Sequence, residues 1–144
     1  DEIARVVDAL DIPVVGNGDI KTPEDALAMR RHTRCAGIMI ARGSFGNPWL
    51  FAQARDLLAG RAKRPDPRPA ERFAVALEHA RLALRLQGDT RKTALEFRKH
   101  LGWYTKGLRD ATELRQRLFT IESMAAAEAI FADYLAENAA PIAA

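Results

Sequence analysis

Two short polar clusters carry the residue types that bind a phosphomonoester. The first is Asn17-Gly18-Asp19 and the second is Ala41-Arg42-Gly43. In each cluster a glycine allows backbone N–H groups to approach a ligand closely. Arg42 adds a guanidinium that forms charge-assisted hydrogen bonds to phosphate oxygens, and Asn17 and Asp19 add polar side chains. The two clusters therefore predict a single anion site with donors from both.

Both clusters follow apolar runs that predict strands and precede segments that predict helices. The strands are expected over Val14–Gly16 and Gly37–Ala41, because both runs are uncharged and too short for a buried helix. Between them, Thr22-Pro23-Glu24-Asp25 supplies a capping hydroxyl, a proline for the first turn and two acids, which predicts a helix over 23–32. This helix start favours a strand–turn–helix unit over the hairpin that Asn17-Gly18 alone would permit. Two such units in succession place both glycine turns at the carboxyl edge of a parallel sheet, where α/β proteins bind ligands.

Three separated segments carry a resemblance to a known family. They are IPVVGNGDI (residues 12–20), GIMIARGSFGNPWLF (37–51) and LEFRKHLGWYTKGL (95–108). Their types and order resemble the tRNA-dihydrouridine synthase family, flavoproteins that reduce selected uridines in tRNA. A complete (β/α)8 TIM barrel needs roughly 250 residues, and this chain has 144. The resemblance therefore implies an α/β plus all-α chain, mostly α overall: the last two βα units of the barrel, followed by a helical tRNA-binding domain.

The resemblance also implies a cofactor and a reaction. FMN is the expected cofactor, NADPH the reductant, and uridine in tRNA is reduced to 5,6-dihydrouridine. The expected FMN contacts are Asn17, Gly18, Asp19, Ala41, Arg42 and Gly43. Ala41 departs from the glycine usual at its position in the family, and its methyl group fits if φ there is negative.

The expected catalytic cysteine belongs to an upstream barrel loop, so no catalytic residue is assigned to this chain. The chain is therefore expected to be inactive alone. Its own Cys35 lies outside the catalytic motif and is predicted to be a small buried packing residue.

A second candidate site lies on the helix predicted over 93–106. Helical spacing places three lysines and one tryptophan on the side opposite Phe97 and Leu101, and two arginines between these two sides. This RNA-binding set consists of Arg91, Lys92, Arg98, Lys99, Trp103 and Lys106. Basic side chains interleaved with an aromatic ring suit a phosphate backbone and a stacked base or ribose. By the resemblance the segment belongs to the tRNA-binding domain, with Arg98 and Lys99 the preferred phosphate contacts.

Charge and proline content divide the chain. Residues 1–60 carry 7 Lys/Arg against 8 Asp/Glu, residues 61–120 carry 15 against 7, and residues 121–144 carry none against 4. A block this basic is typical of a polyanion-binding surface, although a solvated arginine-rich helix surface gives the same balance. Residues 61–69, RAKRPDPRP, hold three prolines and predict a linker.

We therefore expect a partial barrel over 1–60, an antiparallel four-helix bundle over 70–138 and a disordered tail over 139–144. Helices are expected over 1–10, 23–32, 49–59, 70–87, 93–106, 110–119 and 122–137.

Composition narrows the classes of function. One cysteine excludes an internal disulfide, and the spacing of His32 and His79 predicts no metal site. No stretch approaches the ~20 apolar residues of a membrane span, and no signal segment is evident, so a cytoplasmic protein is expected.

Two other functions remain open. One is an FMN-dependent barrel oxidoreductase acting on a small pyrimidine, which would have no need of the basic block. The other is a non-catalytic helical RNA-binding module. In either case two barrel strands alone leave open edges that favour pairing with another chain.

Overall fold

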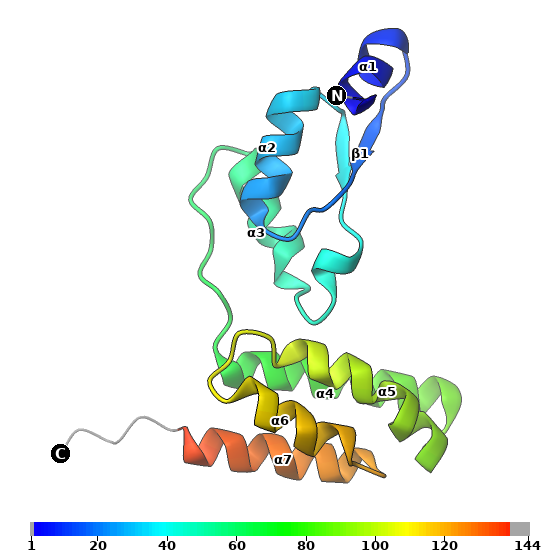
Figure 1. Cartoon of the computed structure of the whole chain (residues 1–144), viewed down its shortest axis with the longest axis vertical. Coiled ribbons are helices and arrows are strands. Elements are labelled where there is room, and N and C mark those ends of the chain that lie inside the picture. Colours follow the sequence, from blue (N-terminus) through cyan, green and yellow to red (C-terminus); the bar gives the residue numbers. More distant parts are fainter. Residues whose placement is uncertain (1, 139–144) are drawn as a thin grey trace, which may run out of the picture. The chain divides into compact units, whose positions relative to one another are not determined.

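The computed structural model describes residues 2–138 and divides into two compact units, one ending at Asp66 and the other beginning at Pro67 (Figure 1). The predicted tail over 139–144 lies outside the described residues. Over the described range the chain is mostly helical with one two-stranded parallel sheet, as predicted. No helix in this range is long and apolar enough to cross a membrane.

The N-terminal unit contains one parallel pair of strands with helices connecting and following them. Its elements are α1 (Glu2–Ala9), β1 (Val15–Asn17), α2 (Pro23–Thr33), β2 (Gly37–Met39), the 3-10 turn η1 (Arg42–Ser44) and α3 (Trp49–Leu58). Val15 pairs with Gly37, and Asn17 pairs with Met39. Helix α3 contacts α2.

Helix α2 begins where the sequence predicts, because its first turn satisfies its own backbone donors. The Thr22 hydroxyl accepts from the N–H of Asp25 at 3.1 Å, and the Asp25 carboxylate accepts from the N–H of Thr22 at 2.8 Å. The N–H of Lys21 also donates to Asp25, at 2.9 Å. These bonds, that from Lys21 foremost, lower the pKa of Asp25.

The core of the N-terminal unit lies on one face of its sheet. Ile20, Ala26 and Ala54 are buried there, and Cys35 is fully buried as predicted. A Cβ built on Gly16 would lie 3.0 Å from the Cys35 sulfur, so the glycine leaves room for the thiol.

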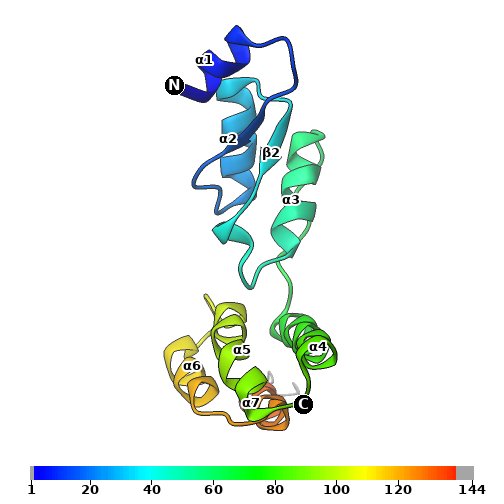
Figure 2. The ribbon, with the colours of Figure 1, turned by 90° about the vertical axis from the view of Figure 1, so that its right-hand side faces the viewer.

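The C-terminal unit consists, in its described part, of α4 (Pro69–Gln87), α5 (Arg91–Tyr104), α6 (Ala111–Phe119) and α7 (Met124–Glu137). Helix α5 contacts α4 and α6, and α7 contacts the same two helices (Figures 1 and 2). Phe73 and Phe131 stack at the centre with ring centroids 4.1 Å apart, and Tyr134 meets the Phe73 ring edge-on at 5.4 Å. Aromatic packing between α4 and α7 therefore holds the first and last helices of this unit together.

Several predicted boundaries differ from the structure. The second strand ends at Met39 rather than Ala41, because η1 turns the chain at Arg42. Pro48 occupies the cap position of α3, and no side chain donates or accepts a hydrogen bond there. Helix α7 begins at Met124 rather than 122, because the Ser123 hydroxyl accepts from the N–H of Ala126 and fixes the start.

Helix α5 is displaced from the predicted range 93–106 to 91–104. The Thr90 hydroxyl accepts from the N–H of Thr93 and sets the earlier start.

Candidate phosphate and nucleic-acid sites

The two glycine turns lie at the same edge of the sheet and touch. Because β1 and β2 run parallel with Asn17 opposite Met39, the segments that follow both strands leave the sheet together. A Cβ built on Gly43 would overlap the carbonyl oxygen of Ile20 and lie 3.2 Å from the Cα of Lys21. Only glycine permits this approach of the two backbones, so Gly43 joins the second turn to the first.

The backbone of the first turn requires the residues found in it. Gly18 has φ of 148°, in a region that side chains rarely adopt, and Asp19 has φ of 46° in the left-handed region. In the second turn Ala41 has φ of −101° and ψ of −110°. Its φ is negative, the condition set for a methyl group here, and its ψ lies outside the broad α and β regions.

The second turn carries donors that the protein itself does not use. Arg42 is exposed, and its guanidinium makes no ion pair or hydrogen bond with any residue from 2 to 138. The N–H groups of Arg42 and Gly43 likewise have no acceptor in that range, whereas the N–H of Ser44 donates to the carbonyl of Ala41. One guanidinium and two adjacent amides are a donor set that fits a phosphomonoester.

The side chains of the first turn are also exposed. Asn17 ends β1 with its side chain exposed, next to the buried Gly16. The Asp19 carboxylate lies 4.0 Å from the Lys21 ammonium on the protein surface. These groups can accept hydrogen bonds from ligand hydroxyls, which complements the cationic second turn.

Gly18 and Asp19 line a cavity of about 360 Å3, to which Arg42 and Gly43 do not contribute. Its other lining residues belong to α1, the β1–α2 segment and α2: Ile3, Ile20, Asp25, Ala28, Met29, His32 and Thr33. The second turn therefore contacts the backbone directly after the first turn, but only the first of the two turns lines this cavity.

The basic residues of the predicted RNA-binding set differ in whether the protein itself already binds their side chains. Arg91 pairs with Glu122 at 2.7 Å, which lowers the pKa of that carboxyl. The half-buried Arg98 donates through Nε to the carbonyl of Ile121 at 2.8 Å. Both arginines tie α5 to the α6–α7 connection.

The lysines of the set are more available. Lys92 lies 3.9 Å from Glu96 at an exposed position, where a pair contributes little. Lys99 and Lys106 are exposed, and neither ammonium pairs with a carboxylate in the described part of the chain. They are the charges of the set best placed to meet a polyanion, Lys99 on α5 and Lys106 two residues beyond its end.

Trp103 belongs to an aromatic cluster shared by α4 and α5. Its ring meets His100 edge-on at 4.8 Å, and His100 lies 5.5 Å from His79 of α4. The Tyr104 hydroxyl lies 3.3 Å from Nδ1 of His79. Burial lowers the pKa of both histidines, and the positive charges of His79 and Lys99 add to the lowering at His100. Sequence spacing gave no sign of this pair, because its two imidazoles come from different helices.

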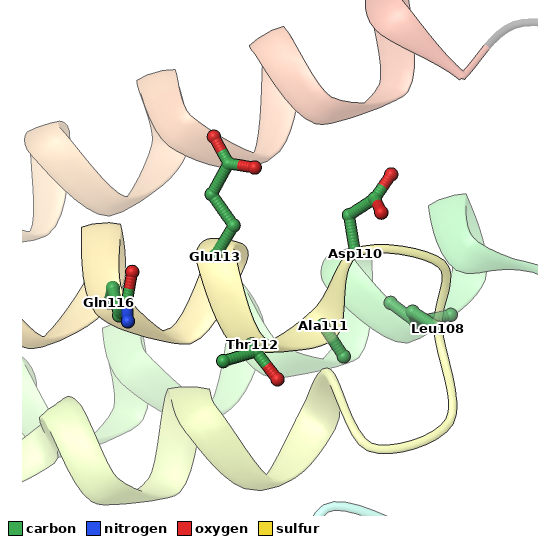
Figure 3. A pocket seen from close by; sticks show the side chains of 6 residues that line it. All are labelled: Leu108, Asp110, Ala111, Thr112, Glu113 and Gln116. Atoms are coloured by element: carbon green, nitrogen blue, oxygen red, sulfur yellow. The ribbon is translucent and has the colours of Figure 1, made fainter.

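A hollow at the start of α6 has the wrong charge for RNA. It has a volume of about 680 Å3 and is lined by Leu108, Asp110, Ala111, Thr112, Glu113 and Gln116. Figure 3 shows the Asp110 and Glu113 carboxylates directed to the same side, toward α7. Two carboxylates without a basic lining residue repel phosphate, so this hollow does not extend the RNA-binding set.

A polar cluster that the sequence did not reveal fixes residues 61–66 on α3. Asp56 is nearly buried and accepts from Arg61 at 2.8 Å and from Arg64 at 2.7 Å. These hydrogen bonds, that from Arg64 first, lower the pKa of Asp56 to about 2. The buried Gln53 donates to Asp66 at 2.8 Å. The first part of the predicted linker is therefore held by the N-terminal unit, and Pro69 already begins α4.

Fold and site together define a class of protein. Two strand–turn–helix units with unused anion donors at their common edge precede a separate helical unit rich in arginine and lysine. This describes an α/β protein with a phosphate-binding strand edge and an appended basic helical region. The chain belongs to the dihydrouridine synthase family, whose model, "Dihydrouridine synthase (Dus)", matches residues 1–140.

Individual relatives agree with this assignment. The chain is 38% identical over 122 residues to a probable tRNA-dihydrouridine synthase 1 of Synechocystis, covering 85% of this chain and 34% of the relative. It is 38% identical over 113 residues to a probable tRNA-dihydrouridine synthase of Mycobacterium leprae, covering 78% of this chain and 29% of the relative. A tRNA-dihydrouridine synthase B of Xanthomonas campestris is 34% identical over 132 residues, covering 92% of this chain and 40% of the relative. The chain thus spans about a third of the length of the curated relatives it matches.

Proposed function

We propose that this chain is the C-terminal part of a flavin-dependent tRNA-dihydrouridine synthase. In this proposal residues 1–60 are the end of an FMN-binding barrel, and residues 70–138 form a four-helix tRNA-binding bundle. The observation that carries the proposal is the contact of the Gly43 backbone with Ile20, which joins the unused donors of the second turn to the first turn.

FMN binding is assigned to the two turns. The Arg42 guanidinium and the N–H groups of Arg42 and Gly43 would hold the phosphate, and Asn17 and Asp19 would accept from ribityl hydroxyls. When bound, FMN supplies hydride transfer to uridine, with NADPH as reductant. The protein residues bind and orient the cofactor. The Arg42 guanidinium and the N–H groups of Arg42 and Gly43 can bind phosphate without first breaking a hydrogen bond within the protein.

An FMN titration followed by flavin fluorescence tests this assignment. Arg42→Ala is expected to weaken binding roughly tenfold or more, since a hydrogen bond to a charged group is worth about 1.5–3 kcal/mol. Arg31→Ala, an exposed arginine of α2, is the matched control. Equal affinities of the Arg42→Ala variant and the unaltered chain would contradict the assignment.

tRNA binding is assigned to the basic helical unit, with Lys99 and Lys106 as phosphate contacts and Trp103 beside them. A filter-binding titration against an unmodified tRNA transcript at several salt concentrations tests it. Affinity is expected to fall steeply as salt rises, because bound cations are released from the phosphates. A tRNA affinity that does not change with salt concentration would contradict a binding surface made of lysines. Absence of tRNA binding would favour the alternative function, an FMN-dependent oxidoreductase acting on a small pyrimidine.

Catalysis is assigned to the longer protein and not to this chain alone. Its one cysteine, Cys35, is fully buried against Gly16 and cannot reach a substrate. The expected result is that the 144-residue chain with FMN and NADPH forms no dihydrouridine in cytoplasmic tRNA. Turnover by the chain alone would show that another residue donates the proton.

A further inference from the structure

We propose that α6 contributes two further residues to the RNA-binding surface, Phe119 as a stacking platform and Arg115 as a phosphate contact. This inference rests on the proposed tRNA binding and extends it to a helix outside the predicted set. It starts from Gly102 of α5, which is buried inside that helix and lies under Phe119. A Cβ built on Gly102 would lie 3.4 Å from Cε2 of Phe119 and 3.7 Å from Cγ of Arg115.

The position of Gly102 places Phe119 beside Lys99 of α5. At about 100° per residue, Gly102 lies about 60° from Lys99 around the axis of α5. Trp103 and its neighbour His100 lie toward α4, on the other side of Lys99. Lys99 is therefore flanked by Trp103 on one side and by Phe119 on the other.

Phe119 differs from the other phenylalanines of its unit. Phe73, Phe97 and Phe131 are buried, whereas Phe119 keeps 49% of its surface exposed. One part of the ring rests on Gly102, and much of the rest is available to solvent. An aromatic ring supported by backbone and flanked by cations suits a stacked base or ribose, since every base has a π-face.

Arg115 is the charged residue on the side of α6 that carries Phe119. Helical spacing puts Arg115 about 40° from Phe119 around the axis of α6, whereas Glu113 of the acidic hollow lies about 120° away. Arg115 donates only within its own helix, to the carbonyl of Ala111 at 3.1 Å and to Thr112 at 3.5 Å. Its charge is not neutralised by any carboxylate of residues 2–138. RNA therefore meets an uncompensated cation next to the exposed ring.

The test compares tRNA affinity of the full chain and its variants at several salt concentrations. Phe119→Leu keeps an apolar contact with Gly102 but removes the π-face, and is expected to raise Kd roughly fivefold or more without changing the salt slope. Arg115→Gln is expected to raise Kd and to reduce the slope by about 0.7, the value of one single-strand phosphate. Leu86→Ala, an apolar residue 77% exposed on α4, and Arg55→Gln on α3 are the controls.

A charge-reversal variant keeps the test valid if Phe119→Leu unfolds the unit. Arg115→Glu is expected to weaken binding and to reduce the salt slope more than Arg115→Gln does, whereas Arg85→Glu at an exposed position of α4 is expected to have the smaller effect. Salt-dependent binding by the unaltered chain together with no effect of Phe119→Leu, Arg115→Gln and Arg115→Glu would overturn this inference while leaving the proposed function intact. Absence of tRNA binding by the unaltered chain would overturn both. A change in self-association by Phe119→Leu with unchanged tRNA affinity would assign the face to a second copy of the chain and also overturn it.

Discussion

Gly43 is the residue on which the contact between the two turns depends. Its backbone lies against Ile20 and Lys21 with no room for a side chain, and the obstructing atoms are backbone rather than a flexible side-chain end. A methyl group here must push the two turns apart. The same displacement would move Arg42 away from the segment that directly follows Asp19, so stability and FMN affinity should fall together.

We therefore predict that Gly43→Ala lowers the free energy of unfolding of the N-terminal unit by about 1–3 kcal/mol, the usual cost of overpacking. Urea unfolding followed by Trp49 fluorescence in a Trp103→Phe background measures it. Gly37→Ala is the control, because its Cβ would lie 3.5 Å from Cγ2 of Val15, an ordinary contact. Equal destabilisation by the two substitutions would argue against a special role for Gly43.

Helix α3 and the segment that follows it are joined by the Asp56 carboxylate. With the pKa of Asp56 lowered from 3.8 to about 2, the unfolded chain binds this proton more readily than the folded chain. The stabilisation is therefore present above about pH 4 and is lost as the pH falls through about 2.

We predict that Asp56→Asn frees the segment 61–66 at neutral pH, because Arg61 and Arg64 lose their shared partner. Limited trypsin digestion should then cut after Arg61 or Lys63 several-fold faster than in the unaltered chain. Asp89→Asn, an exposed acid of the other unit, serves as the comparison. Unchanged cleavage rates in Asp56→Asn would show that the prolines alone hold the segment.

His79 of α4 and His100 of α5 form a pair whose protonation, like that of Asp56, makes stability depend on pH. The folded state lowers the pKa of both imidazoles, so near pH 6 the unfolded chain binds more protons than the folded chain. By linkage this contribution to stability is present above about pH 6.5 and is lost as the pH falls below that value. The charged groups near the pair include Lys99, and no carboxylate of the described residues pairs with either ring.

We predict that the melting temperature of the C-terminal unit falls by several degrees between pH 7.5 and pH 5.5. The double variant His79→Gln and His100→Gln should flatten this dependence, whereas His32→Gln in the other unit should not. Circular dichroism melts at matched ionic strength provide the measurement. A pH dependence that persists in the double variant would place its origin elsewhere.

At the scale of the whole molecule, local sequence patterns predicted the features that are determined by residues close together in the sequence. The capping residues of α2, the two short strands and the basic block in the helical region follow from composition and spacing. The Asp56 cluster and the contact of Phe119 with Gly102 do not, because they join residues brought together only by tertiary packing. Arg98 shows the same limit: its charge pattern marked it for phosphate, but the fold directs its Nε–H to the carbonyl of Ile121.

An assignment of backbone amides by NMR, with FMN and riboflavin added in parallel, tests the account most directly. The two ligands share the flavin ring and differ in the phosphate, which is the group assigned to the turn after β2. FMN is expected to shift the amide signals of Gly18, Arg42 and Gly43 together, and riboflavin is expected to leave those of Arg42 and Gly43 unmoved. Identical shifts with both ligands, or FMN-induced shifts confined to other residues, would contradict a phosphate site at the joined turns.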